Sequence, residues 1–155
     1  FLFLEKNLWL LNMNISECLE RGLLKKISPS MEKANRSIVV AKSKLEKAKA
    51  LLNVGILDMS EVNIYASMFH ASRALLFKDG FKEKSHYAIY IYLCEKYHSK
   101  IPSKFLNELN VLRLDRHEIF YGLEEEPNLS EEDVNKTISL VQEYIELIER
   151  LIKDK

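Results

Sequence analysis

Apolar residues recur every three or four positions along most of the chain, the spacing that places them on one face of an α-helix. Ser30 is a good N-cap for the clearest such segment, because its hydroxyl can accept a hydrogen bond from a first-turn amide. Gly55 is expected to end that helix. Its many alanines would let a neighbouring helix approach closely. The apolar stripe consists of Ala34, Ile38, Ala41, Leu45, Ala48 and Leu52.

The same spacing predicts helices on both sides of this segment. A short helix is expected from about residue 16 to residue 24. A longer one begins near Asp58 or Ser60 and reaches Gly80. It is apolar over more than half of its circumference, so we expect it to be the central and most buried helix.

Three further helices are indicated by their first residues. Ser85 would cap a helix that continues to Tyr97, and Pro102 would lie in the first turn of the next. Ser130 would cap the last helix, whose apolar positions run from residue 134 to residue 152. No segment alternates apolar and polar residues with a period of two, so no sheet is predicted. The pattern predicts an all-α, up-and-down bundle of five to six helices.

The composition is that of one globular domain. The chain has 155 residues, 47% hydrophobic and 30% charged, with only 4 Gly and 3 Pro to interrupt its helices. We assign residues 13–155 to the helical domain and residues 1–12 to an N-terminal extension, either not native or a docking segment. Its apolar run is too short to span a membrane.

The charge is balanced in total but not in distribution. The net charge is zero and the pI about 7.1, which argues against a general nucleic-acid coat protein. Residues 21–50 carry nine Lys or Arg against two Glu, and residues 118–150 carry ten acids against two bases. Either these faces compensate each other, or the first is a basic surface for RNA or an acidic partner.

The cysteines indicate a reducing compartment. Cys18 and Cys94 are far apart and in no paired motif, so we expect reduced thiols in a cytoplasmic protein. Cys94 and His98 have the spacing of metal ligands on one helix, but no further ligands lie near them in the sequence. Neither a metal nor a cofactor is expected.

An arginine interrupts the apolar face of the helix that follows Pro102. Arg116 lies one turn after Leu112, where an unpaired charge is costly. Arg113 and His117 are neighbours on that helix, and Tyr121 lies one turn beyond His117. The structural interpretation is that Arg116 extends to the surface and pairs with an acid of the last helix. The functional interpretation is that it binds an anion.

Several ordered motifs carry a family resemblance. The segment from Tyr65 to Leu76 (YASMFHASRALL), Gly80-Phe81, Lys84-Ser85-His86 and the segment Cys18 to Ser30 resemble HEPN (higher eukaryotes and prokaryotes nucleotide-binding) proteins, especially an uncharacterised prokaryotic branch. The resemblance covers Met13 to the end of the chain. It implies an up-and-down bundle that dimerises, with sites facing each other across the dimer axis.

Many HEPN proteins are metal-independent ribonucleases with an Arg, a polar residue, three variable residues and a His. The corresponding residues here are Arg116, His117 and Tyr121. Tyrosine, with a pKa near 10, is a poor replacement for a base that must titrate near neutrality. The departure therefore argues against cleavage, whereas anion binding by Arg116 is unaffected by it.

The remaining histidines have simpler interpretations. His70 has Arg73 one turn on, and the pair is either a polar contact beside the core or part of a ligand site. His86 follows the cap Ser85 and most simply fixes the turn. We take Arg113, Arg116, His70 and Arg73 as candidate ligand-binding residues.

Three functions are consistent with these residues. The first, which the resemblance implies, is a nucleotide- or RNA-binding component of a toxin–antitoxin-like module, paired with a minimal nucleotidyltransferase. The second is an endoribonuclease toxin that uses Arg116 with His117 or Tyr121. The third is a structural helical dimer without a ligand. In each case a homodimer is expected, because the apolar face near Phe120 and Tyr121 exceeds what one small bundle needs.

Overall fold

The computed structural model describes residues 13–123 and 129–154. Six helices and two short strands are found in these residues. They are α2 (Ile15–Glu20), β1 (Leu24–Lys26), α3 (Met31–Asn53), α4 (Leu57–Asp79), β2 (Phe81–Glu83), α5 (His86–Lys96), α6 (Ser103–Tyr121) and α7 (Glu131–Lys153). The predicted all-α bundle is confirmed.

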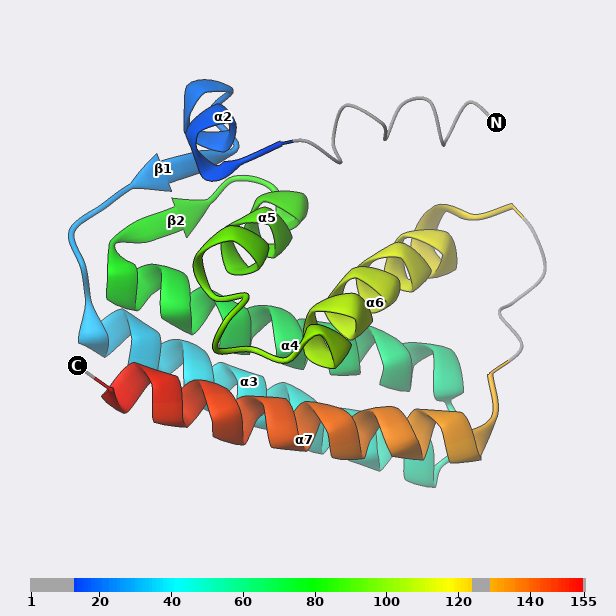
Figure 1. Cartoon of the computed structure of the whole chain (residues 1–155). Coiled ribbons are helices and arrows are strands. Elements are labelled where there is room, and N and C mark those ends of the chain that lie inside the picture. The colour runs from blue at the N-terminus through cyan, green and yellow to red at the C-terminus, as the bar shows by residue number, and fades with distance from the viewer. Residues whose placement is uncertain (1–12, 124–128, 155) are drawn as a thin grey trace.

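Helix α4 is the centre of the bundle, as its apolar circumference predicted. It packs against α3 and α7 on one side and against α5 and α6 on the other. Figure 1 shows α3, α4 and α7 lying side by side as a layer, with α5 and α6 above it. Because α4 is covered on both sides, its side chains reach the core and also the boundary with α5 and α6.

The contact between α3 and α4, which we call the α3–α4 seam, is built from small residues. Ala34, Ala41 and Ala48 are fully buried along it, so the two backbones approach closely. Serine hydroxyls fill the remaining space and donate to backbone carbonyls of the facing helix, which satisfies polar groups that would otherwise be costly to bury. These bonds are Ser37 Oγ to His70 O (2.6 Å), Ser60 Oγ to Ala48 O (2.8 Å) and Ser67 Oγ to Ala41 O (2.7 Å).

The prediction that the chain has no sheet is wrong. Strands β1 and β2 pair antiparallel, with Leu24 opposite Glu83 and Lys26 opposite Phe81. Each strand has three residues, too few to show an alternating pattern. Consequently the first helix stops at Glu20, earlier than expected. Gly80 joins α4 to β2 at φ 91°, and a Cβ there would meet the Ile27 carbonyl oxygen at 2.9 Å.

The predicted serine caps are confirmed. Ser30, Ser85 and Ser130 each accept a hydrogen bond from a first-turn amide of α3, α5 and α7. Pro102 lies one residue earlier than expected, at the N-cap of α6. Both cysteines are free thiols. Among the helices described, none is long and apolar enough to cross a membrane.

Candidate functional site

Arg116 lies half-buried on the side of α6 that faces α4. It follows the buried Leu112 by one turn, so its aliphatic stem extends along the inward face of the helix. Its guanidinium lies 5.9 Å from the ring centre of Tyr65 on α4 and 5.2 Å from that of Phe120. Within residues 13–123 and 129–154, no carboxylate is within ion-pair distance of Arg116. The expected ion pair between Arg116 and an acid of the last helix is therefore not found among the described residues.

Arg113 lies one turn earlier on the same side of α6. Its guanidinium lies 4.9 Å from the ring centre of Tyr87 on α5, and its Nη2 donates to Asn110 Oδ1 at 3.0 Å. Burial lowers the pKa of Arg113, but arginine stays protonated at neutral pH. In the described part of the chain, Arg113 also has no carboxylate partner. Two adjacent cations thus share one surface, each held against an aromatic ring.

His86, the first residue of α5, completes this surface. Its Nδ1 lies 2.7 Å from the hydroxyl of Tyr65, the same ring over which Arg116 stands. The imidazole also stacks on Phe69, with ring centres 4.3 Å apart and planes at 22°. We call Arg113, Arg116, His86 and Tyr65 the arginine–histidine site.

The electrostatics of His86 reflect its cationic neighbours. Burial lowers its pKa, and the positive charges of Arg116, Arg113 and Arg73 lower it further. Burial likewise raises the pKa of Tyr65 to about 12. Both side chains are therefore neutral near pH 7, and the net charge of the site comes from its arginines.

Arg73 differs from the arginines of α6 because it has an acidic neighbour. Its Nε lies 2.9 Å from Glu83 Oε1 on β2. Its guanidinium also lies over the rings of Phe69 and Phe77, at 5.6 and 5.0 Å. Its charge is thus largely balanced within the fold.

His117 and Tyr121 lie on the solvent side of α6. Both are exposed, Tyr121 by 69%, and their rings contact each other with centres 5.0 Å apart. The structure therefore separates these two residues from the inward-facing Arg113 and Arg116.

His70 lies on α4, away from α6. Burial and, to a smaller extent, the positive charges of Arg73 and Lys44 lower its pKa to about 4, so it is neutral at physiological pH. It lines a shallow hollow of about 230 Å³ between α3 and α4, which we call the basic hollow. The hollow is lined by Lys33, Arg36, Ser37, Val40, His70, Arg73 and Phe77.

Sequence reasoning did not assign His86 and Tyr65 to the site. His86 was interpreted as a turn residue and Tyr65 as core. The signal for Tyr65 is its four-residue spacing from Phe69, which in turn precedes Arg73 by four. Such a row places two aromatic rings and a cation on the same face of α4, where a neighbouring helix can contact them. No local pattern shows that α5 brings His86 to this row.

The fold is an all-α bundle in which α6 places two arginines over aromatic rings of α4 and α5. Comparison with protein families is consistent with that description. The HEPN domain model matches residues 34–151, so the chain belongs to the HEPN-domain family. This confirms the resemblance seen in the sequence. No curated protein matches the chain.

Proposed function

We propose that this HEPN-domain protein binds RNA or a nucleotide by its phosphate at the arginine–histidine site. The observation that carries the proposal is the pair of half-buried guanidinium groups of Arg113 and Arg116, which lack a carboxylate neighbour in the described residues. A buried cation without a counter-ion is costly. Arginine matches phosphate oxygens with two parallel N–H donors, so a bound phosphate would supply the missing charge.

The aromatic rings beneath the arginines support a binding role. Tyr65 is buried, and its ring limits where the Arg116 guanidinium can lie. Tyr87 does the same for Arg113. Donors that are already positioned lose less conformational entropy when a ligand arrives, which favours affinity.

The experiment is a binding titration with a fluorescently labelled short RNA. Arg116→Gln should weaken binding about tenfold to a hundredfold, because a hydrogen bond to a charged group is worth about 1.5–3 kcal/mol. Arg150→Gln, at an exposed position on α7, is the matched control and should bind like wild type. Equal affinities of all three proteins would contradict the proposal.

The proposal extends to the protein's assembly. We infer a homodimer in the cytoplasm, in a toxin–antitoxin-like module with a separate minimal nucleotidyltransferase. Apolar side chains at the end of α6 support a partner surface, since Phe120 is 49% exposed and Leu123 fully exposed. Co-purification of the chain with the product of its neighbouring gene tests the second partner.

A second candidate function, RNA cleavage, is favoured by the position of His86. Histidine is the side chain suited to accept a proton from a ribose 2′-hydroxyl near neutral pH. In this reaction the deprotonated 2′-oxygen attacks the phosphorus and forms a cyclic phosphate. The 5′-oxygen leaves and takes a proton from the solvent or a protein acid. Arg116 would stabilise the charge on the phosphate oxygens.

Cleavage of a labelled RNA separates this candidate from binding alone. If His86 is the base, His86→Gln should slow cleavage about 10²- to 10⁴-fold. His117→Gln should change the rate little, because His117 lies on the solvent side of α6. A slow rate for His117→Gln with a normal rate for His86→Gln would assign the base to His117. No cleavage by wild type leaves binding as the function.

A further inference from the structure

The basic hollow combines cationic and apolar side chains from two helices. Lys33, Arg36 and Val40 share one face of α3, because they are spaced by three and four residues. Phe77 faces them from α4 and, with Val40, contributes apolar surface. The hollow therefore offers positive charge at its rim and an apolar floor.

The charge of the hollow is only weakly neutralised. Lys33 has no ion pair in the parts of the chain that the structure describes. Arg36 pairs with Glu32 at 3.1 Å, but both side chains are at least three-quarters exposed, so solvent screens the attraction. Arg73 is balanced by Glu83, and His70 is neutral. Lys33 and Arg36 thus remain available to an anionic ligand.

The hollow and the arginine–histidine site share a neighbour on α4, the ring of Phe69, which is only 9% exposed. Phe69 links them: His86 stacks on its face, and the ring of His70 meets it edge-on at 5.4 Å and 83°. Arg73 lies one turn further along α4 and lines the hollow. From Tyr65 to Arg73 the helix rises roughly 12 Å, a distance that several nucleotides of a single strand can span.

We propose that single-stranded RNA lies along α4, with one phosphate in the arginine–histidine site and a neighbouring stretch of the strand in the basic hollow. This rests on the proposed function and makes it more specific, because a mononucleotide would occupy only the first site. Grooves that bind single strands combine backbone-tracking cations with apolar or aromatic surface, as the hollow does. The inferred ligand class is therefore an oligonucleotide.

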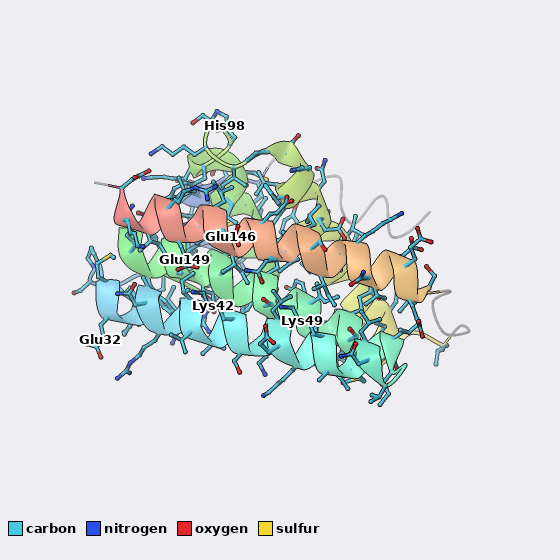
Figure 2. The ribbon with its side chains drawn as sticks, turned by 90° about the horizontal axis from the view of Figure 1, so that it is seen from below. Glu32, Lys42, Lys49, His98, Glu146 and Glu149 are labelled. Atoms are coloured by element: carbon cyan, nitrogen blue, oxygen red, sulfur yellow. The ribbon has the colours of Figure 1, made fainter. Side chains whose placement is uncertain are left out.

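Lys42 supplies a matched control on the same helix. It lies nine residues after Lys33, which places it on the opposite side of α3. There its Nζ lies 3.0 Å from Glu149 Oε1 on α7. Figure 2 shows the two labelled side chains where α3 and α7 run side by side. Removing its charge alters the net charge of the protein but not the hollow.

The experiment measures binding of labelled RNA dinucleotide, tetranucleotide and octanucleotide at several salt concentrations. For wild type, affinity should rise with length. The double variant Lys33→Gln, Arg36→Gln should bind the dinucleotide normally and the octanucleotide about tenfold more weakly. For the octanucleotide, the slope of log K against log salt concentration should be smaller in magnitude by about 1.4, because two phosphate contacts are lost and each contact with a single strand contributes about 0.7. Lys42→Gln should behave like wild type.

Each other result has a defined meaning. If the dinucleotide binds through Arg116 but the octanucleotide binds no better, the inference about the hollow fails while the proposed function stands. If Lys42→Gln weakens the octanucleotide as much as the double variant, only net charge matters and the hollow is not a subsite. If a polyglutamate peptide competes as well as RNA, the ligand class is wrong. If wild type binds a mononucleotide but no RNA of any length, the inference about the hollow fails while the proposed function stands. If it binds neither, both proposals fail.

Discussion

The α3–α4 seam and the end of α6 differ in how their polar and aromatic side chains are satisfied and in how far these side chains are buried. Along the seam, serine hydroxyls donate to carbonyls of the facing helix, and fully buried alanines let the two backbones approach closely. At the end of α6, residues 113–123, cations stand over aromatic rings, and the terminal side chains are exposed. The seam buries its side chains within one chain, whereas the end of α6 leaves Phe120, Tyr121 and Leu123 exposed.

Two tyrosines illustrate the difference. Tyr144 on α7 is fully buried, and its hydroxyl lies 2.6 Å from Ser72 Oγ on α4. Tyr121 contacts the rings of His117 and Phe120 on its own helix and is 69% exposed. The same residue type therefore contributes to stability in the core and is available to a partner at the end of α6. Stability and binding should respond to separate sets of substitutions.

The largest expected effect is on the seam. Ala41→Leu inserts extra volume where α3 and α4 are in close contact, and overpacking of a core typically costs about 1–3 kcal/mol. We expect about 3 kcal/mol lower free energy of unfolding, measured by urea denaturation. Ala50→Leu adds the same volume at an exposed position of α3 and should change stability by less than about 0.5 kcal/mol. Equal losses in both variants would show that the seam is not tightly packed.

The next effect concerns the apolar end of α6. The double variant Phe120→Ser, Leu123→Ser should weaken the homodimer by about 2 kcal/mol, or roughly 30-fold in dissociation constant. Val54→Ser, which removes another exposed apolar side chain beyond α3, should leave dimerisation unchanged. Sedimentation equilibrium measures both. A wild type that is monomeric at micromolar concentration would contradict the assignment of this surface.

The third prediction concerns a cluster of carboxyl groups between α4 and α6. Glu61 on α4 is only 7% exposed, and it faces Asp115 and Glu108 on α6. Burial, a hydrogen bond with Asp115 and the negative charges of Asp115 and Glu108 together raise the pKa of Glu61 to about 8. The folded protein therefore keeps this carboxyl protonated at neutral pH.

Protonation of Glu61 makes stability depend on pH. Between about pH 4.5 and pH 8 the unfolded chain releases this proton while the folded chain retains it, so the free energy of unfolding falls as pH rises. Glu61→Gln stays neutral and should be more stable than wild type by about 1–3 kcal/mol at pH 8, with little difference at pH 4. Thermal unfolding across this range tests it. Glu46→Gln, at an exposed position on α3, should show no such pH-dependent gain.

The smallest effect is expected at Tyr121. Tyr121→His restores the family's Arg-polar-x-x-x-His pattern, but the new imidazole would point to solvent, away from the inward face that carries Arg116. Cleavage of RNA should therefore not increase, and stability should change by less than about 0.5 kcal/mol. A gain in cleavage that Arg116→Ala abolishes would show that the outer face of α6 is catalytic, and would overturn the assignment to His86.

Helix positions were predictable because burial imposes a period on the sequence. The stripe of α3 and the serine caps of α3, α5 and α7 are local patterns, and all were confirmed. The sheet was missed because pairing of Lys26 with Phe81 depends on how α3 and α4 fold back on each other. A three-residue strand contains no information about a partner more than fifty residues away.

The candidate site was predictable only in part. Arg116 was identified because an unpaired charge on an apolar helix face is costly, and it does lie half-buried beside α4. Helical spacing placed Arg116 on the apolar face, but it grouped Arg113 with His117 and Tyr121 and did not show that Arg113 faces inward while the other two face solvent. His86 belongs to another helix, and its approach to Tyr65 is a tertiary contact that no spacing along the chain records.

The pairing of β1 with β2 also has a consequence for folding. It joins segments that are separated by the whole α3–α4 hairpin, so its closure is entropically costly until the two helices have docked. Two amides mark this junction: Ile27 N–H donates to the Gly80 carbonyl, and Lys84 N–H donates to the Leu23 carbonyl. Both should exchange with solvent deuterium whenever the hairpin opens. Two amides at one end of the molecule thus report on whether α3 and α4 are docked.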